Sequence, residues 1–253
     1  MQADNLQVLI YETRSQMGTA AAAQVADRIH KLLGVQPFVN IIFAAAPSQN
    51  EFLSAIRQLP VDWSRIRGFH MDEYIGLDRG AVQAFGHFLR ENLFDLVPIR
   101  EVYYLDGNAT SWQEECRRYS GLLEQFPPDI VCMGIGENGH IAFNDPPVAD
   151  FRDPATVKVV VLDAACRQQQ VNDGCFPILE AVPERALTLT IPALMAARWV
   201  FCIVPGKSKA TAVFNTLYKD IKEEYPATIL RRHPQAILYL DQLSSANLQK
   251  HAL

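Results

Sequence analysis

Short apolar runs alternate along this chain with segments of helical periodicity, and this alternation constrains the fold more than any other feature. Residues 6–10 and 39–44 are apolar and strand-like. Between them, an apolar residue stands at every fourth position from Met17 to Leu33, as on the buried face of an amphipathic helix. Repeated strand–helix units predict an α/β fold with a mostly parallel sheet and helices on both faces.

The same alternation continues to the end of the chain. Further strands are predicted at residues 68–71, 102–105, 130–133, 199–204 and 236–240. Further helices are predicted at residues 49–59, 85–93, 112–126 and 207–217. Thr110 and Gln113 match a capping box for the third of these helices. Because no repeat, low-complexity segment or Gly/Ser linker interrupts the pattern, we predict one domain over residues 1–253, with an open, doubly wound, Rossmann-like sheet.

Charge and cysteine content narrow the class of protein. A formal net charge of -5 gives no support to a nucleic-acid or membrane-surface partner, and no apolar run approaches the ~20 residues that a membrane span needs. The five cysteines form no CxxC pair, and two of them, Cys132 and Cys202, lie in apolar runs typical of inert core thiols. The first residues lack the pattern of a secretion signal, so we expect a cytoplasmic protein.

The segment at residues 129–147, DIVCMGIGENGHIAFNDPP, carries the strongest functional signal. It places His140 on a glycine-rich loop at the carboxyl end of a strand, where ligands gather in open α/β sheets. Histidine titrates near neutral pH and can both accept and donate protons. His140 alone has the alternative of a structural role, but Asn138 and Asp145 lie close enough in sequence to orient its ring. We therefore predict a proton-transfer site.

The glycines of this loop formally satisfy the GxGxxG pattern of dinucleotide-binding proteins. That pattern requires a helix to begin at the loop, whereas Pro146 and Pro147 leave no room for one. A nicotinamide or flavin site is therefore rejected. Instead, Gly136 and Gly139 are predicted to bring the backbone close to a small substrate.

A second candidate site follows the strand at residues 199–204. Gly206, Lys207 and Ser208 resemble the end of a phosphate-binding P-loop, but Phe201 stands where the full pattern requires glycine. The nucleotide interpretation fails. A strand that leads through PGKSK into a helix still offers backbone amides and Lys209 to an anion, the alternative being a solvated first helical turn.

Asp72 is the third candidate, at the end of a short predicted strand in the run HMDEYIGL. Read alone, such an acid is more often a surface group or a helix cap, and its neighbour Glu73 points to the opposite side. Asp72 and His140 nevertheless both follow apolar strands, so a parallel sheet would bring them to one crevice. No HExxH motif and no cluster of metal-ligand spacing is present, so we expect neither a metal nor an organic cofactor.

Together these segments resemble the glucosamine-6-phosphate deaminase/isomerase family. MDEYIGL at residues 71–77 is similar to that family's catalytic acid motif, and GIGENGHIAFNDP at 134–146 to its histidine motif. The segments at 182–213 and 231–241 are similar to its later strand–helix unit and its closing strand. The 6-phosphogluconolactonases share the fold, but a GHTASLF-like run is expected there in place of GHIAFN.

The resemblance implies a reaction and roles for residues. His140 would open the pyranose ring of an amino sugar phosphate, and Asp72 would move a proton from C2 to C1, with release of a ketose phosphate and ammonia and without a cofactor. Asn138 and Asp145 match catalytic positions beside the histidine. Glu73 follows the catalytic acid and is expected to contact substrate. The resemblance also implies a homo-oligomer.

Two departures from the family pattern concern the phosphate end, and a third is Asp145, which stands where the family has the longer glutamate. The family's TGGTP-like loop is here Ala44-Ala45-Ala46-Pro47-Ser48, which lacks the glycines and the threonine hydroxyl. Asn172 falls where the family has a phosphate-binding arginine, and Arg167 matches a different position; Lys209 matches the family's phosphate lysine. We predict that the substrate contacts Ala45, Ala46, Ser48, Arg167 and Lys209.

Three functions therefore remain to be separated. The first is deamination and isomerisation of glucosamine 6-phosphate to fructose 6-phosphate. The second is action on a different sugar phosphate or on a lactone, because the phosphate loop is altered. The third is a non-catalytic sugar-phosphate sensor, against which the retained Asp72 and His140 argue.

Overall fold

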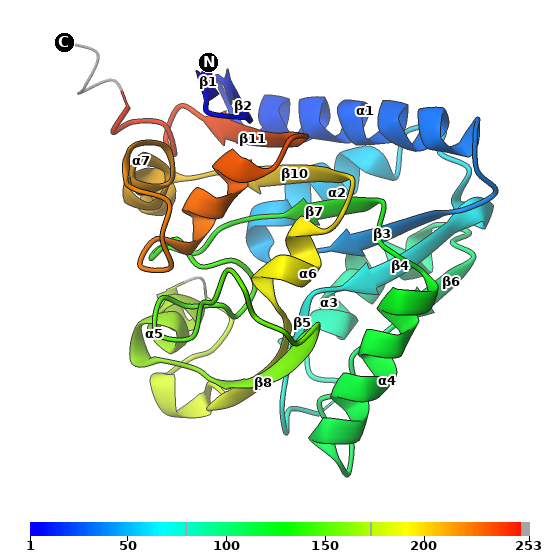
Figure 1. Cartoon of the computed structure of the whole chain (residues 1–253), viewed down its shortest axis with the longest axis vertical. Coiled ribbons are helices and arrows are strands. Elements are labelled where there is room, and N and C mark those ends of the chain that lie inside the picture. The colour runs from blue at the N-terminus through cyan, green and yellow to red at the C-terminus, as the bar shows by residue number, and fades with distance from the viewer. Residues whose placement is uncertain (79, 173, 249–253) are drawn as a thin grey trace.

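The computed structural model describes residues 1–78, 80–172 and 174–248. Within these residues the main element is a sheet of eight strands, which are β1 (Gln2–Ala3), β2 (Leu6–Tyr11), β3 (Val39–Phe43), β4 (Ile66–His70), β6 (Glu101–Tyr103), β7 (Ile130–Met133), β10 (Trp199–Val204) and β11 (Ala236–Asp241). Their order across the sheet is β1-β2-β11-β10-β7-β3-β4-β6 (Figure 1). Every pair is parallel except β1 with β2, so the predicted open, mostly parallel sheet is confirmed.

Helices cover both faces of this sheet, as predicted. One face carries α1 (Arg14–Leu33), α2 (Asn50–Ile56) and α3 (Phe85–Asn92), and the other carries α4 (Trp112–Gln125), α6 (Ile191–Met195) and α7 (Ala210–Tyr218). In Figure 1, α4 and α6 lie in front of the sheet and α2 and α3 behind it. In β7, Ile130 and Cys132 pack against the first set of helices, and Val131 and Met133 against the second. Burial on both faces explains why this strand is continuously apolar.

A second sheet was not predicted. It is antiparallel and contains β5 (Asp72–Tyr74), β9 (Arg185–Leu189) and β8 (Val157–Val161), with α5 (Ala164–Asn172) packed against it. The strand predicted at 68–71 corresponds to the end of β4, and β5 begins directly after Met71. The chain in fact changes sheets at Met71, and Asp72 pairs with Thr188 in β9. Asp72 therefore stands at the junction of the two sheets.

Two local predictions also need correction. The cap of α4 is Ser111, whose Oγ accepts a hydrogen bond from the Glu114 backbone N–H at 3.3 Å, rather than a capping box of Thr110 and Gln113. The predicted helix at 207–217 begins as a 3-10 turn, Lys207–Lys209, before α7. The remaining short 3-10 turns are Pro47–Gln49, Trp63–Arg65, Phe94–Leu96, Leu179–Ala181 and Pro226–Arg232.

The strand order places a crevice between the carboxyl ends of β3 and β7. From β3 the chain builds outward through β4 and β6, and it then returns to β7 on the opposite side of β3. The loops that follow β3 and β7 consequently diverge at their carboxyl ends, which is where open α/β sheets bind ligands. Across the described ranges, no helix combines the length and apolarity needed to cross a membrane.

Candidate active site

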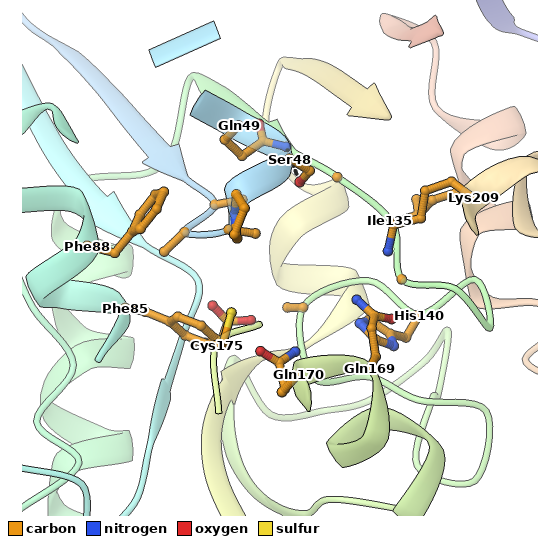
Figure 2. A pocket seen from close by; sticks show the side chains of 18 of the residues that line it. Ser48, Gln49, Phe85, Phe88, Ile135, His140, Gln169, Gln170, Cys175 and Lys209 are labelled. Atoms are coloured by element: carbon orange, nitrogen blue, oxygen red, sulfur yellow. Dashed lines mark hydrogen bonds between the residues drawn. The ribbon is translucent and has the colours of Figure 1, made fainter. Parts of the chain in front are cut away.

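A cavity of about 410 Å³ lies at this point of the main sheet (Figure 2). The loops after β3 and β7 contribute residues 44–49 and 134–136 to its wall, the loop after β10 contributes Pro205, Gly206, Ser208 and Lys209, and Asp72 comes from the junction of the two sheets. Helices α3 and α5 close the remaining sides. Asp72 and His140, which lie 68 positions apart in sequence, thus line one cavity, as the sequence predicted.

The backbone of Asp72 is fixed by a buried histidine. Nδ1 of His70 donates a hydrogen bond to the Asp72 carbonyl oxygen at 2.8 Å, and Nε2 accepts one from the Leu105 backbone N–H at 3.0 Å. Burial lowers the pKa of His70 to about 4, although the hydrogen bond to Asp72 opposes that shift. His70 is therefore neutral near pH 7 and holds the catalytic candidate in place without itself lining the cavity.

Asp72 is 8% exposed. Its burial raises its pKa well above the ordinary aspartate value, and the neighbouring charge of Glu73 raises it further. Among the residues that the structure describes, none donates a hydrogen bond to this carboxylate. A carboxylate that is poorly solvated and unpaired is a strong proton acceptor, which suits a general base.

Glu73 does not line this cavity, contrary to prediction. Its carboxylate accepts hydrogen bonds from the backbone N–H groups of Tyr74, Phe85 and Gly86 at 2.8–3.1 Å and so caps the start of α3. Burial raises the pKa of Glu73 to about 6 despite these three bonds, and Asp106 adds to the rise. Side chains alternate along β5, so Glu73 lines a separate hollow on the far side of the strand.

His140 is held by its own loop. Asn138 Oδ1 accepts a hydrogen bond from the His140 backbone N–H at 3.0 Å, and the Gly136 N–H donates to the His140 carbonyl at 2.9 Å. The imidazole lies directly over Gly136, where an added Cβ would overlap the ring. Gly139 has a φ of +85°, a conformation that favours glycine, but it does not line the cavity.

Asp145 lies behind the His140 ring. Its Oδ1 is 2.9 Å from His140 Nδ1, and the Asn138 side-chain amide donates a hydrogen bond to the same oxygen at 2.8 Å. Burial by itself would raise the pKa of Asp145, but His140, Asn138 and the Cys166 thiol together bring it below the ordinary value. Asp145 is thus an anion at neutral pH. Asn138 and Asp145 contact His140 rather than the cavity.

The opposite end of the cavity is built from the loops after β3 and β10. Ala45, Ala46, Ser48 and Lys209, for which substrate contact is predicted, line it. Ala46 is extended, with a φ of -157°, and no residue of 44–48 has a positive φ. The loss of the family's glycines therefore strains nothing in this loop.

Arg167 does not reach the cavity, so its predicted substrate contact is not supported. Its Nη2 atom donates hydrogen bonds to the carbonyl oxygens of Leu179 at 2.8 Å and Val182 at 3.0 Å. Asn172 does not line the cavity either, and it accepts a hydrogen bond from Gln168. The arginine at the rim is instead Arg14, at the start of α1, whose guanidinium contacts Glu51 and the Pro47 carbonyl. Sequence reasoning missed Arg14 because it belongs to no recognisable motif.

Two glutamines of α5 were also missed. Gln169 and Gln170 line the cavity beside His140 and Cys175, and Figure 2 shows the Gln170 amide directed into the hollow. Gln169 Oε1 accepts a hydrogen bond from the Glu137 backbone N–H at 2.8 Å. The sequence signal for them was that α5 carries the polar residues Gln169 and Gln170 on the face that packs inward, where apolar residues are usual. Phe85 and Phe88, from α3, form the apolar wall opposite.

Comparison with known proteins gives concordant results. The model of the family described as glucosamine-6-phosphate isomerases/6-phosphogluconolactonase matches residues 12–239. A glucosamine-6-phosphate deaminase of Bacillus cereus is 38% identical over 187 residues, which are 74% of this chain and 70% of that protein. One from Streptococcus suis is 34% identical over 205 residues, which are 81% of this chain and 86% of that protein.

Solved structures agree with these matches. A structure described as a monomeric glucosamine-6-phosphate deaminase superposes with a TM-score of 0.86 at 28% identity, over 95% of this chain and 99% of that one. A 6-phosphogluconolactonase from Thermotoga maritima superposes with a TM-score of 0.77 at 18% identity, over 93% of this chain and 99% of that one. The second likeness shows the fold alone.

Proposed function

Since this chain belongs to the glucosamine-6-phosphate isomerase/6-phosphogluconolactonase family, we propose that it is a deaminase-like enzyme that converts glucosamine 6-phosphate and water to fructose 6-phosphate and ammonia. The observation that carries this proposal is that Asp72 and His140 line one cavity whose far end presents Ser48 and Lys209. Two proton-transfer groups and an anion-binding end suit a phosphorylated amino sugar.

We assign ring opening to His140. The imidazole accepts the proton of the anomeric hydroxyl and delivers a proton to the ring oxygen as the C1–O5 bond breaks. The anionic Asp145, 2.9 Å from Nδ1, stabilises the imidazolium that forms between the two transfers. Asn138 binds both partners and is a positioning residue.

We assign the second proton transfer to Asp72. Its carboxylate removes the proton from C2 of the open chain; the electron pair forms the C1–C2 double bond of an enolamine, the C1–O1 π bond breaks, and O1 takes up a proton from water. Asp72 then returns the proton to C1 as the amino nitrogen forms the C2 imine and releases a proton to water, and water hydrolyses this imine to a ketone and ammonia. Each positioned transfer typically contributes about 10²–10⁴-fold in rate. The burial and raised pKa of Asp72 support this role.

The remaining lining residues would bind the sugar. Lys209 and the Ser48 hydroxyl, which line the cavity, would bind the phosphate, with the backbone of Ala45 and Ala46 alongside. Near the opposite end, the Gln170 amide is placed to bind a sugar hydroxyl or the amino group. Gly136 lets both the substrate and the His140 ring approach the backbone. No step of this sequence requires a metal or an organic cofactor.

The decisive experiment measures ammonia and fructose 6-phosphate released by the purified protein from glucosamine 6-phosphate. Equal amounts of both products support the proposal, and absence of both at millimolar substrate refutes it. A panel of other hexosamine phosphates and 6-phosphogluconolactone distinguishes the alternative substrates. Tight binding of a sugar phosphate without turnover would instead identify a sensor.

We further infer that residues 1–253 form one domain, supported by the family match across 12–239. The family resemblance favours a cytoplasmic homo-oligomer, whereas one structural relative is described as monomeric. Light scattering of the purified protein decides between a monomer and an oligomer.

A further inference from the structure

Behind the cavity, three potential metal ligands converge from two segments of the chain. His140 and Asp145 come from the loop after β7, and Cys166 comes from α5. One ring nitrogen, one carboxylate oxygen and the sulfur all lie within 4.8 Å of one another. The three residues are 8%, 2% and 1% exposed, respectively. Only His140 lines the cavity, so the cluster lies directly beneath its floor.

Within the described residues, the histidine of this cluster has an ion-pair contact with Asp145 but no well-directed hydrogen bond at Nδ1. His140 Nδ1 is buried and close to Asp145 Oδ1, yet its angle is not that of a directed hydrogen bond, and no other described residue pairs with it. A buried polar atom without a partner costs free energy and calls for an explanation. A metal ion that accepts the nitrogen lone pair would supply the missing partner.

We propose that His140, Asp145 and Cys166 form a site for a divalent transition-metal ion, zinc(II) above all, with a fourth position for water. Nitrogen, oxygen and sulfur ligands in a tetrahedral arrangement suit zinc, and three protein ligands leave one position for water or substrate. Magnesium and calcium prefer all-oxygen ligand sets, which this cluster lacks. Bond lengths of about 2.0–2.3 Å place such ligand atoms roughly 3–4 Å apart, so the cluster closes around an ion through small side-chain rotations.

Metal binding and catalysis exclude each other at this site. The Cys166 S–H proton passes to solvent as the sulfur–metal bond forms. The ion also takes the lone pair of His140 and the charge of Asp145, so His140 can no longer carry the proton in ring opening. Zinc therefore inhibits the enzyme by occupying its histidine. This consequence, unlike metal binding itself, rests on the proposed function.

Cobalt(II) tests the site without reference to activity. The purified protein is titrated with cobalt under anaerobic conditions, and the absorption spectrum is recorded. We expect the near-ultraviolet band of thiolate-to-cobalt charge transfer, together with the strong visible bands of tetrahedral cobalt, saturating at one ion per chain. Competition with zinc then gives the zinc affinity. Absence of both bands at excess cobalt overturns the proposal.

Two serine variants identify the sulfur ligand. Cys166→Ser removes it with little change in size, and Cys175→Ser removes a second thiol that lines the cavity. The charge-transfer band should disappear in Cys166→Ser only. Loss of a residue that only hydrogen-bonds to a metal ligand typically weakens metal binding by roughly 10–100-fold. Because Cys166 is a direct ligand, its replacement should weaken zinc binding by more than this. A band that survives Cys166→Ser, or that Cys175→Ser abolishes, refutes the assignment; thermal melting confirms that both variants fold.

Zinc inhibition of ammonia release is measured on the same proteins, each relative to its own activity without metal. Wild-type protein should lose activity as the site fills, and Cys166→Ser should need at least tenfold more zinc. If cobalt binds as described but no substrate is turned over, the proposed function fails while the metal site stands. If substrate is turned over but cobalt gives no band, the metal site fails alone.

Discussion

At the proton-transfer end of the cavity, Asp72 and His140 are buried, and Asn138 and Asp145 hold His140 from behind. The backbone of Asp72 is held in turn by neutral His70. At the anion end, formed by residues 44–48 and by Pro205, Gly206, Ser208 and Lys209, three described side chains of these loops, Ser48, Ser208 and Lys209, offer donors to an anion.

This difference separates two physical tasks. Proton transfer requires reacting atoms held in one geometry, since a displacement of about 1 Å can cost 10²-fold in rate. A phosphate group can be bound by several combinations of amides, hydroxyls and cations, so that loops of different sequence serve equally. We therefore expect changes at the proton-transfer end to lower kcat and changes at the anion end to raise KM.

Asp72→Asn should have the largest effect. The amide has almost the same shape but cannot accept the C2 proton, so kcat should fall by about 10²–10⁴-fold with KM nearly unchanged. Ammonia release under saturating substrate measures this. If Asp72→Asn keeps more than a tenth of wild-type kcat, Asp72 is not the base that removes the C2 proton.

Stability of the same variant gives an independent check. The folded-state pKa of Asp72 is raised, so the ionised carboxylate destabilises the fold at neutral pH, and wild-type stability declines as pH rises from the ordinary carboxyl range through that raised pKa. Asparagine removes this decline. The Tm of Asp72→Asn at pH 7 should equal or exceed that of wild type, and the difference should vanish at low pH, where the wild-type carboxyl is protonated.

Gly136→Ala should have the next largest effect. The new methyl group overlaps the His140 ring and must displace it from Asp145, so kcat should fall by about 10²-fold. Gly121→Ala is the matched control, because a methyl group there meets no neighbouring atom. Wild-type kcat in Gly136→Ala would show that the position of the ring is not critical.

Much of the fold and of the proton-transfer end was accessible from sequence. The continuous apolar run of β7 predicted a central strand, and the glycines and His140 that follow it predicted a loop at the carboxyl edge. These predictions succeeded because strand burial and loop chemistry are local properties. Asp72 was placed correctly for the same reason, although its membership of a second, antiparallel sheet was not foreseen.

The anion end and α5 were less accessible, because their functions depend on packing between distant segments. Arg167 was predicted to bind substrate, yet its guanidinium is occupied by two carbonyl groups across a turn that no local pattern specifies. Cys166 appeared in sequence as one thiol among five, and only the fold brings it beside Asp145. Distances between segments decide such roles, and one sequence does not give them.

Lys209→Met tests the anion end. Methionine keeps the length of the side chain but removes the cation, and a hydrogen bond to a charged group contributes about 1.5–3 kcal/mol. Since 1.4 kcal/mol is tenfold in binding, KM should rise by about 10–100-fold with kcat nearly unchanged. The control is Lys207→Met, a neighbouring cation outside the cavity. Equal effects of the two changes on KM would show that Lys209 acts only through long-range electrostatics and not through a direct contact with the phosphate.

Ser48→Ala should have the smallest effect. The hydroxyl is one neutral donor at the end of a loop whose amides remain, and a bond of this kind contributes about 0.5–1.5 kcal/mol, or roughly a 2–10-fold change in KM. The exposed Ser54→Ala on α2 is the control. A kcat loss in Ser48→Ala as large as that of Gly136→Ala would contradict the separation of the two ends, because the Ser48 hydroxyl also accepts a hydrogen bond from buried Gln49 at 3.1 Å. In that case the anion end would be as rigid a part of the catalytic geometry as the histidine loop.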